Sequence, residues 1–216
     1  MTEHHRVAEY LSGPEELSRK ELVWGIVREP AAPTCSHQAV VVRTLLVLAP
    51  HVTRHALGRL LVSPVDVVLD AQKALVLQPD IVFVAAARES IVRDRIWGAP
   101  DLVVEVLSPG TRRRDTLTKR RWYRRYGVRE YFIIDPVSKT VEVSTLDETT
   151  GRSRRKTTHG RGLVRSNVLT GFAEPARTFF EQATSPRRFR RRAQFCEVVV
   201  IGPASWPLAQ IRFENP

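Results

Sequence analysis

The chain has 216 residues, enough for one domain with a substantial hydrophobic core. Hydrophobic residues make up 43% and charged residues 26%, which is ordinary for a globular protein and excludes a wholly disordered chain. Lys and Arg together number 34 against 23 Asp and Glu, and the resulting charge of +11 favours a polyanionic partner. The two cysteines, Cys35 and Cys196, are too few for a disulfide framework or a Cys-rich zinc module.

The N-terminal residues show no apolar core of a secretory signal, and no apolar run approaches the roughly 20 residues that span a bilayer. We therefore expect a cytoplasmic protein without a membrane partner. The composition changes where the basic run SPRRFRRR begins, so we expect a domain over 1–184 and a basic tail over 185–216. The tail is either a DNA-binding extension or a disordered stretch without selected structure. Its lack of helical or strand periodicity favours the second interpretation.

The pattern of apolar residues predicts alternating helices and strands, and therefore an α/β domain. We expect a short helix over 14–21, then a strand over 22–29 that one glycine interrupts, then a helix over 37–49. A further helix is expected over 111–126, ended by Gly127. The remaining strands are expected at 65–69, 80–85, 101–107, 130–134 and 140–144.

Glu105 stands in the middle of an apolar strand, between Val104 and Val106. A charged carboxylate in such a strand is costly unless it is paired or binds a metal ion. One interpretation is a paired strand residue, because the chain has many arginines. The other is a metal site, which needs a second carboxylate within reach; Asp80 and Asp101 are the candidates.

Strand geometry separates these two candidates. Asp101 and Glu105 are four residues apart on one strand, about 13 Å at roughly 3.3 Å per residue, so they cannot hold one ion. Asp80 begins the preceding strand, and an antiparallel pairing centred on the connection places it opposite Leu107. Asp80 and Glu105 are then diagonal neighbours, about 7 Å apart at the backbone. Two carboxylates at that spacing suit Mg²⁺ or Mn²⁺ better than zinc.

The helix that follows Glu105 carries Asp115, Lys119 and Tyr123 at intervals of four residues, so the three share one stripe. Lys119 is one of only five lysines in the chain. A lysine can approach a water molecule or a scissile phosphate as a compact charge, which the planar fork of an arginine does not reproduce. The alternative is that Lys119 is a solvated partner of Asp115, and the spacing alone favours neither.

The segments QPDIVFV (78–84) and GAPDLVVEVLSPGTRRRDTLTKRRWYRRYGVREYFIIDP (98–136) resemble the Uma family of putative restriction endonucleases, within the PD-(D/E)xK nuclease superfamily. The likeness extends over roughly 10–183. It implies a restriction-endonuclease-like core, in which helices flank a mixed sheet and a divalent metal ion lies at the carboxylates. The family also implies a homodimer.

The resemblance assigns the motif aspartate to Asp80 and the motif glutamate to Glu105. The superfamily usually has a lysine two residues after that glutamate, where this chain has Leu107, and Lys119 matches the lysine that this family carries on the next helix. The set of catalytic residues that the resemblance implies is completed by Tyr123, Glu21 and His37. For His37, a histidine that only satisfies the start of its helix is an equally good interpretation.

The mechanism that the resemblance implies is hydrolysis of DNA, with Mg²⁺ or Mn²⁺ held by Asp80, Glu105 and the backbone carbonyl of Val106. His37 would add a ligand or a route for a proton. Arginines of the helix would neutralise the DNA backbone. They are Arg112, Arg113, Arg114, Arg120, Arg121, Arg124 and Arg125.

Three hypotheses therefore remain open at the level of the sequence. The first is a metal-dependent DNA endonuclease. The second is a nucleic-acid-binding protein on a nuclease fold that no longer cuts, which Leu107 and the basic excess favour. The third is a structural or toxin–antitoxin partner that assembles through residues 185–216.

Overall fold

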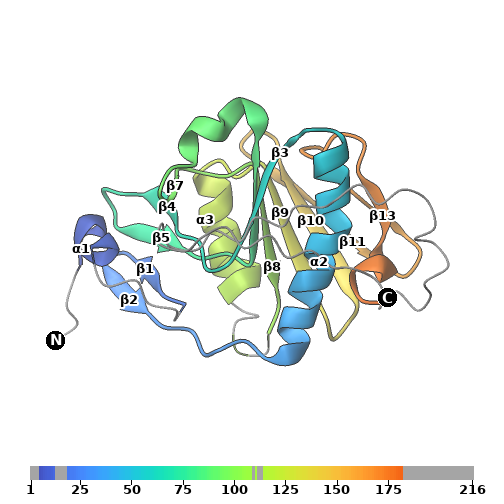
Figure 1. The fold of residues 1–216 in the computed structure, drawn as a ribbon, viewed down its shortest axis with the longest axis horizontal. Coiled ribbons are helices and arrows are strands. Elements are labelled where there is room, and N and C mark those ends of the chain that lie inside the picture. The colour runs from blue at the N-terminus through green and yellow to red at the C-terminus, as the bar shows by residue number, and fades with distance from the viewer. Residues whose placement is uncertain (1–4, 13–18, 109, 111–113, 182–216) are drawn as a thin grey trace, which may run out of the picture. The chain divides into compact units, whose positions relative to one another are not determined.

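A six-stranded mixed sheet in the order β11-β10-β9-β8-β6-β3 forms the centre of the fold (Figure 1). The computed structural model describes residues 5–12, 19–108, 110 and 114–181, which belong to a unit spanning Met1–Thr184. Strands β8 and β9 run parallel, and the other neighbours run antiparallel. The six strands are β3 (Gly58–Val62), β6 (Ile81–Ala85), β8 (Leu102–Val106), β9 (Glu130–Asp135), β10 (Thr140–Leu146) and β11 (Ser153–His159).

A second sheet of five strands, in the order β2-β1-β5-β4-β7, packs beside the first. Its inward residues, such as Leu75 and Leu77, share one buried cluster with Val82 and Val103 of the six-stranded sheet. This packing closes one face of the central sheet along part of its length. The strands outside the central sheet are β1 (Glu21–Val23), β2 (Ile26–Arg28), β4 (Val67–Asp70), β5 (Leu75–Leu77) and β7 (Ile96–Trp97), and the separate pair β12 (Leu163–Arg165) and β13 (Ala173–Pro175).

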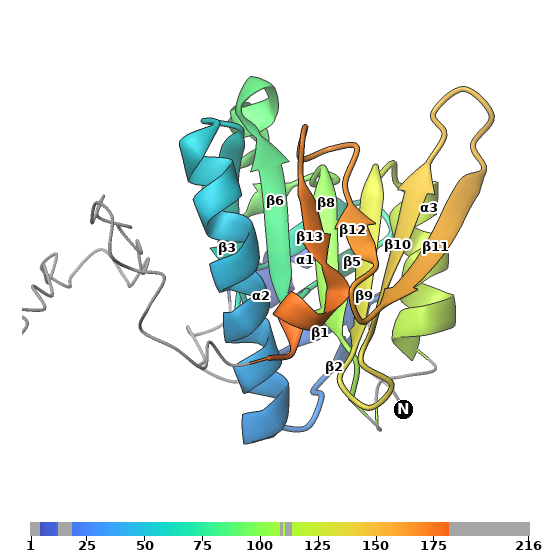
Figure 2. The same ribbon diagram turned by 90° about the vertical axis from the view of Figure 1, so that its right-hand side faces the viewer.

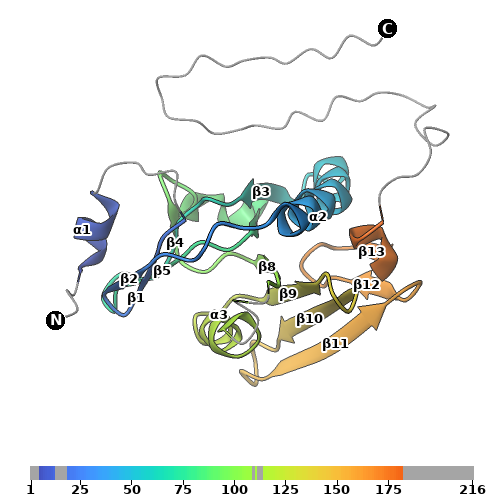
Figure 3. The ribbon, with the colours of Figure 1, turned by 90° about the horizontal axis from the view of Figure 1, so that it is seen from below.

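The two longer helical elements cover opposite faces of the central sheet. Helix α2 and the β12–β13 pair lie on one face, and α3 lies on the other (Figures 2 and 3). The α-helices are α1 (Val7–Leu11), α2 (Cys35–Arg54) and α3 (Arg120–Arg125), and a π-helical turn, η2 (Arg114–Lys119), leads directly into α3. Two 3₁₀ turns are η1 (Ala86–Ile91) and η3 (Ala176–Phe179).

Helix α2 forms because its sequence supplies both a start signal and an apolar stripe. The Thr34 side chain accepts a hydrogen bond from the backbone N–H of His37 at 3.3 Å and caps the first turn. Val41, Leu48 and Val52 recur at helical spacing and are buried. The stripe joins a cluster with residues of β6, β8 and β9, so the first turn of α2 is held at one end of these strands.

Strand β8 is buried on both faces, which is why its sequence is almost continuously apolar. Leu102 and Val104 belong to the cluster on the α2 face, and Val103 and Leu107 belong to the cluster on the α3 face. Side chains alternate along a strand, so Glu105 points to the same face as Val103, toward α3.

The mixed α/β fold expected from the sequence is confirmed, and so are the helix over 37–49 and four strands of the central sheet, β6, β8, β9 and β10. The two outer strands of that sheet, β3 and β11, were not predicted. The single strand expected over 22–29 is wrong. It is a hairpin of β1 and β2, whose two-residue turn has positive φ at Trp24 (54°) and Gly25 (81°). This conformation matches the twist of a tight hairpin, and the bulky tryptophan in the first turn position concealed it.

The helix expected over 14–21 is wrong at its end, because Glu21 begins β1 and the two residues before it are not helical. The rest of that segment, and the tail over 185–216, lie outside the described residues. Of the helix expected over 111–126, residues 114–125 form η2 followed by α3, and residues 111–113 lie outside the described residues. Gly127 follows with φ of 86°. Within the described ranges no helix is both long and apolar enough to cross a membrane.

Candidate metal and nuclease site

Asp80 and Glu105 come together where β6 begins and β8 ends. The antiparallel register pairs Ile81 with Val104, so its continuation places Asp80 directly opposite Glu105. The expected pairing of Asp80 with Leu107 is therefore wrong by two residues. The pair is closer than expected, since directly opposite residues are about 5 Å apart at the backbone. The error arose from the assumption that the connection is symmetric about its centre, whereas it contains η1 and the strand β7 of the second sheet.

An arginine that the sequence analysis did not consider lies between the two carboxylates. Nη1 of Arg19 is 2.9 Å from Oδ1 of Asp80, and Nη2 is 3.5 Å from Oε2 of Glu105. Nη2 also donates to the backbone carbonyl of Gln78. The sequence gives no signal for this contact, because Arg19 precedes Asp80 by 61 residues and lies in a segment predicted to be helical.

The second oxygen of Asp80 is held by the backbone and by α2. Oδ2 accepts a hydrogen bond from the N–H of Val106 at 2.7 Å and lies 3.4 Å from Nε2 of His37. The same His37 nitrogen is 3.0 Å from the carbonyl oxygen of Val106. Nδ1 of His37 is buried and has no hydrogen-bond partner among the described residues. The first turn of α2 thus brings His37 to the carboxylate pair.

Lys119 is the buried cation on the α3 side of the site. Its ammonium group lies 2.6 Å from Oε1 of Glu105, 3.0 Å from Oε1 of Glu21 and 3.6 Å from Oδ1 of Asp115. The hydroxyl of Tyr123 donates to the same Glu105 oxygen at 3.1 Å. Only 3% of Lys119 is exposed, so the interpretation as a solvated partner of Asp115 is wrong. The stripe of Asp115, Lys119 and Tyr123 faces the interior.

The electrostatics on the α2 side favour an ionised aspartate. Burial raises the pKa of Asp80, but the hydrogen bond from His37 and the positive charge of Arg19 outweigh it, and the pKa falls below its usual value. The hydrogen bond to Asp80 in turn raises the pKa of His37, against the effect of burial. The surroundings therefore favour the ionised form of Asp80 and the protonated form of His37.

The electrostatics on the α3 side are different, because there the carboxylates crowd one cation. Burial, together with the negative charges of Asp115 and Asp80, raises the pKa of Glu105 to about 8 although Lys119 opposes the shift. Burial also disfavours the charge of Lys119, but the surrounding carboxylates outweigh it and raise the pKa of this lysine. The raised pKa of Glu105 indicates that a further cation would be accommodated beside these carboxylates.

The side chains at hand fit a hard divalent cation in their chemistry. Asp80 and Glu105 each direct one carboxylate oxygen toward the same cation, Arg19. The carbonyl of Val106 lies 3.0 Å from Nε2 of His37, the nitrogen that faces the other oxygen of Asp80. Mg²⁺ and Mn²⁺ take oxygen ligands of this kind. Within the described ranges no group of three His, Cys, Asp or Glu side chains is arranged to hold a metal ion. The two carboxylates therefore need the backbone carbonyl and water to complete a coordination shell.

The arginines expected to contact DNA separate into three groups. Arg120 is partly buried and pairs with Glu142 of β10. Arg121, Arg124 and Arg125 are exposed on α3. The others lie outside the description: Arg112 and Arg113 entirely, and Arg114 in its side chain.

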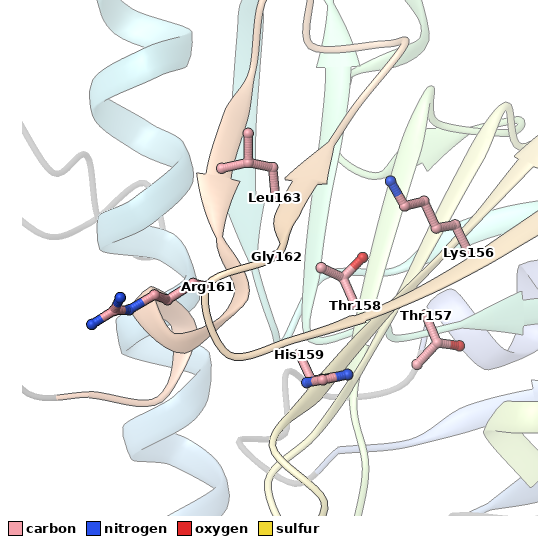
Figure 4. A pocket seen from close by; sticks show the side chains of 7 residues that line it. All are labelled: Lys156, Thr157, Thr158, His159, Arg161, Gly162 and Leu163. Atoms are coloured by element: carbon pink, nitrogen blue, oxygen red, sulfur yellow. The ribbon is translucent and has the colours of Figure 1, made fainter.

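Sequence reasoning also missed a basic edge on the far strand of the central sheet. The exposed residues Arg154, Arg155 and Lys156 follow one another on β11, which has a neighbour on one side only. A hollow of 380 Å³ lies beside this strand, and none of the carboxylates described above lines it (Figure 4). Its lining residues are Lys156, Thr157, Thr158, His159, Arg161, Gly162 and Leu163.

Comparison with known proteins relates this geometry to one family. A family model described as "Uma2: Putative restriction endonuclease" matches residues 7–178. Among solved structures, the chain is similar to a putative nuclease belonging to DUF820 from Anabaena variabilis ATCC 29413. The two share 18% identity and a TM-score of 0.68, over 82% of this chain and 97% of that one. At this identity the similarity shows a common fold. A search of curated proteins gave no match.

Proposed function

The chain belongs to the Uma2 family of putative restriction endonucleases, and from this premise we propose that it is a metal-dependent endonuclease that hydrolyses phosphodiester bonds in DNA. Family membership supports a nuclease. The observation that carries the finer proposal is the buried pair of Asp80 and Glu105 at adjacent strand ends, with Lys119 in contact with Glu105. Burying these charged groups together is unfavourable for the stability of the fold, and such clusters are typical of functional sites; a nuclease site is one of this kind.

In the proposed site, Asp80, Glu105 and the backbone carbonyl of Val106 hold a magnesium or manganese ion. When bound, such an ion polarises the phosphodiester and makes water a better nucleophile. The N–H of Val106 fixes one oxygen of Asp80, and the hydroxyl of Tyr123 fixes one oxygen of Glu105. The remaining oxygen of each carboxylate is left for the cation.

Lys119 and His37 supply the charge and the proton route of the proposed mechanism. Lys119 takes the place of the in-strand lysine that Leu107 excludes, and its ammonium group offsets the charge that develops on the phosphate. Glu21 keeps that ammonium group at the carboxylate cluster. His37, beside Asp80, is placed to accept or return a proton, and the hydrogen bond to Asp80 raises its pKa.

The proposed DNA contacts are sequence-independent. Arg121, Arg124 and Arg125 are exposed on α3, the helix that also carries Tyr123 to the site, and we propose that they bind phosphates of the DNA backbone. Such contacts position a duplex without reading its sequence. The side chains of Arg112, Arg113 and Arg114 stay part of this prediction.

Plasmid nicking in Mn²⁺ and in EDTA tests the proposal, with calorimetric titration of Mn²⁺ as a second readout. We expect wild type to nick DNA only with metal present, and Asp80→Asn to lose both nicking and Mn²⁺ binding. Asp94→Asn is the matched control, because Asp94 is exposed and its side chain accepts a hydrogen bond from Trp97, outside the cluster. Nicking that persists in EDTA, or in Asp80→Asn, would contradict the proposal.

A second function, nucleic-acid binding without cleavage, is favoured by one specific observation. Leu107 occupies the position of the superfamily's in-strand lysine, and the available lysine is enclosed by three carboxylates. This hypothesis predicts salt-sensitive DNA binding that persists in EDTA and in Glu105→Gln, without nicking under any metal condition.

The cytoplasmic location and the homodimer stay predictions. Deleting 185–216 tests the hypothesis that the tail mediates assembly. A changed elution volume in size-exclusion chromatography would support that hypothesis, and an unchanged oligomeric state would exclude it.

A further inference from the structure

We propose that Arg19 is the internal counter-cation of the carboxylate pair, and that a divalent ion enters the site by displacing its guanidinium group. This inference rests on the proposed function, since it concerns the same metal site. Arg19 is then a positioning residue that neither the sequence pattern nor the family description includes. It neutralises the two carboxylates while no metal ion is bound.

Each of the two carboxylates has one oxygen that neighbouring groups hold and one oxygen that faces Arg19. One oxygen of Asp80 is held by the N–H of Val106 and by His37, and one oxygen of Glu105 is held by Lys119 and Tyr123. The other two oxygens, Oδ1 of Asp80 and Oε2 of Glu105, are the ones that face a guanidinium nitrogen. Arg19 thus sits on the two oxygens that remain for a cation.

Arg19 is held less completely than Lys119, the other cation of the site. Its side chain is 20% exposed, against 4% for Lys119. Its contact with Glu105 is 3.5 Å long, while Lys119 approaches the same residue to 2.6 Å. Nε of Arg19 is buried without a hydrogen-bond partner among the described residues. A guanidinium with a path to solvent and an unsatisfied nitrogen is the cation that can leave.

Arg19 also reduces the electrostatic repulsion between Asp80 and Glu105. Two buried carboxylates at adjacent backbone positions repel each other, and removing one partner of a buried charge pair is strongly unfavourable. Arg19 neutralises this repulsion when no metal ion is bound. A divalent cation performs the same task with twice the charge, so the two cations compete for one place.

Competition and simple structural support predict opposite results when Arg19 is replaced. If Arg19 only holds the carboxylates in position, its loss loosens them and weakens metal binding. If it competes, its loss frees two oxygens and strengthens metal binding. The sign of the change in affinity therefore distinguishes the two roles, independently of any activity.

The experiment is a calorimetric titration of the full chain with Mn²⁺ alone, in wild type, Arg19→Gln, Arg19→Lys and Asp80→Asn. Arg59→Gln is the matched control, because Arg59 forms an exposed pair with Glu89 away from the site. We expect Arg19→Gln to bind Mn²⁺ at least about tenfold more tightly than wild type, since one competing charge is gone. Arg19→Lys lies between the two, because an ammonium group cannot bridge both carboxylates. Arg59→Gln matches wild type.

Equal or weaker Mn²⁺ binding by Arg19→Gln would overturn the proposal. If Arg19→Gln does not fold, as judged by circular dichroism, Arg19→Lys decides in the same way: binding tighter than wild type supports competition, and equal or weaker binding contradicts it. Loss of binding in Asp80→Asn without a gain in the Arg19 variants would remove the role of Arg19 and leave the proposed metal site standing. No binding by any variant would contradict both.

Discussion

Each end of strand β8 has a buried carboxylate, and the two carboxylates have different surroundings. Asp101, just before the strand, is fully buried; its oxygens accept hydrogen bonds from the N–H of Ala85 at 2.8 Å and from Arg88 at 3.0 Å. Glu105, near the other end, meets Lys119, Tyr123 and more distantly Arg19. Both are satisfied by partners, so burial alone does not tell a structural carboxylate from a site.

The difference lies in the local balance of charge. Around Asp101 the cations equal or exceed the carboxylates, since Arg129 is also 3.6 Å away. At the other end, four buried carboxylates crowd two full cations. They are Asp80, Glu105, Glu21 and Asp115, with Lys119 and Arg19. This excess of carboxylates contributes to raising the pKa of Glu105 to about 8, and a bound metal ion would relieve it. The other end of the same strand has no such excess.

The largest effect on stability is expected from replacing Lys119, the cation that three carboxylates share at the Glu105 end of β8. Lys119→Met leaves three carboxylates without their common partner, so we expect a loss of about 3–5 kcal/mol in the free energy of unfolding. Urea denaturation measures it. Lys139→Met, in a surface turn, is the control and should change stability by less than about 0.5 kcal/mol. A loss as small as that of the control would mean that the carboxylates are not ionised together.

A smaller loss of stability is expected at the Asp101 end of β8, where arginines balance the charge of the carboxylate. Asp101→Asn keeps the shape of the side chain but loses its charge against Arg88, and we expect a cost of about 1–3 kcal/mol. Its affinity for Mn²⁺ should be unchanged, because the residue lies away from the cluster. Weakened Mn²⁺ binding in a folded Asp101→Asn protein would show that the two ends are not independent.

Tyr123→Phe tests the Glu105 end of β8 more finely, because it removes the hydrogen bond to Glu105 and keeps the aromatic ring. We expect a cost of about 1 kcal/mol in stability. The pKa of Glu105 should rise further, since the hydroxyl stabilises its ionised form. Tyr10→Phe, which removes a hydroxyl from the carbonyl of Lys20, is the control with a similar cost. Only the Tyr123 variant should bind Mn²⁺ more weakly near neutral pH, and equal affinities would contradict the assignment.

The smallest effect concerns His37. Its pKa is raised above the ordinary 6.5 by the hydrogen bond to Asp80. The stability that this gives is fully present below pH 6.5 and is lost as the pH rises through the raised pKa. Thermal melts from pH 5.5 to 8.5 should therefore show a downward step that His37→Gln abolishes. The exposed His55 offers the control: His55→Gln should keep the step.

The sequence was informative where a polar residue breaks an apolar pattern. Glu105 stands out in β8, and Asp80 begins the preceding apolar run. The spacing of Lys119 and Tyr123 describes a helical face, and all four residues meet in the structure. The register was the error, because the length of a connection does not determine how two strands align.

What could not be predicted depends on contacts between distant segments. Arg19 reaches the site only because β1 pairs with β5, which carries the N-terminal segment to the start of β6. No local pattern encodes that pairing. The hairpin at Trp24 was missed for a different reason, since the residue preferences of such turns favour Asn or Gly over tryptophan.

The most direct test of the account compares Glu105→Gln with Asp101→Asn, the two ends of one strand, by titration with Mn²⁺. The account predicts that Glu105→Gln loses Mn²⁺ binding and that a folded Asp101→Asn protein keeps the affinity of wild type. Equal affinity in both variants and wild type would contradict a metal site at the Asp80–Glu105 pair.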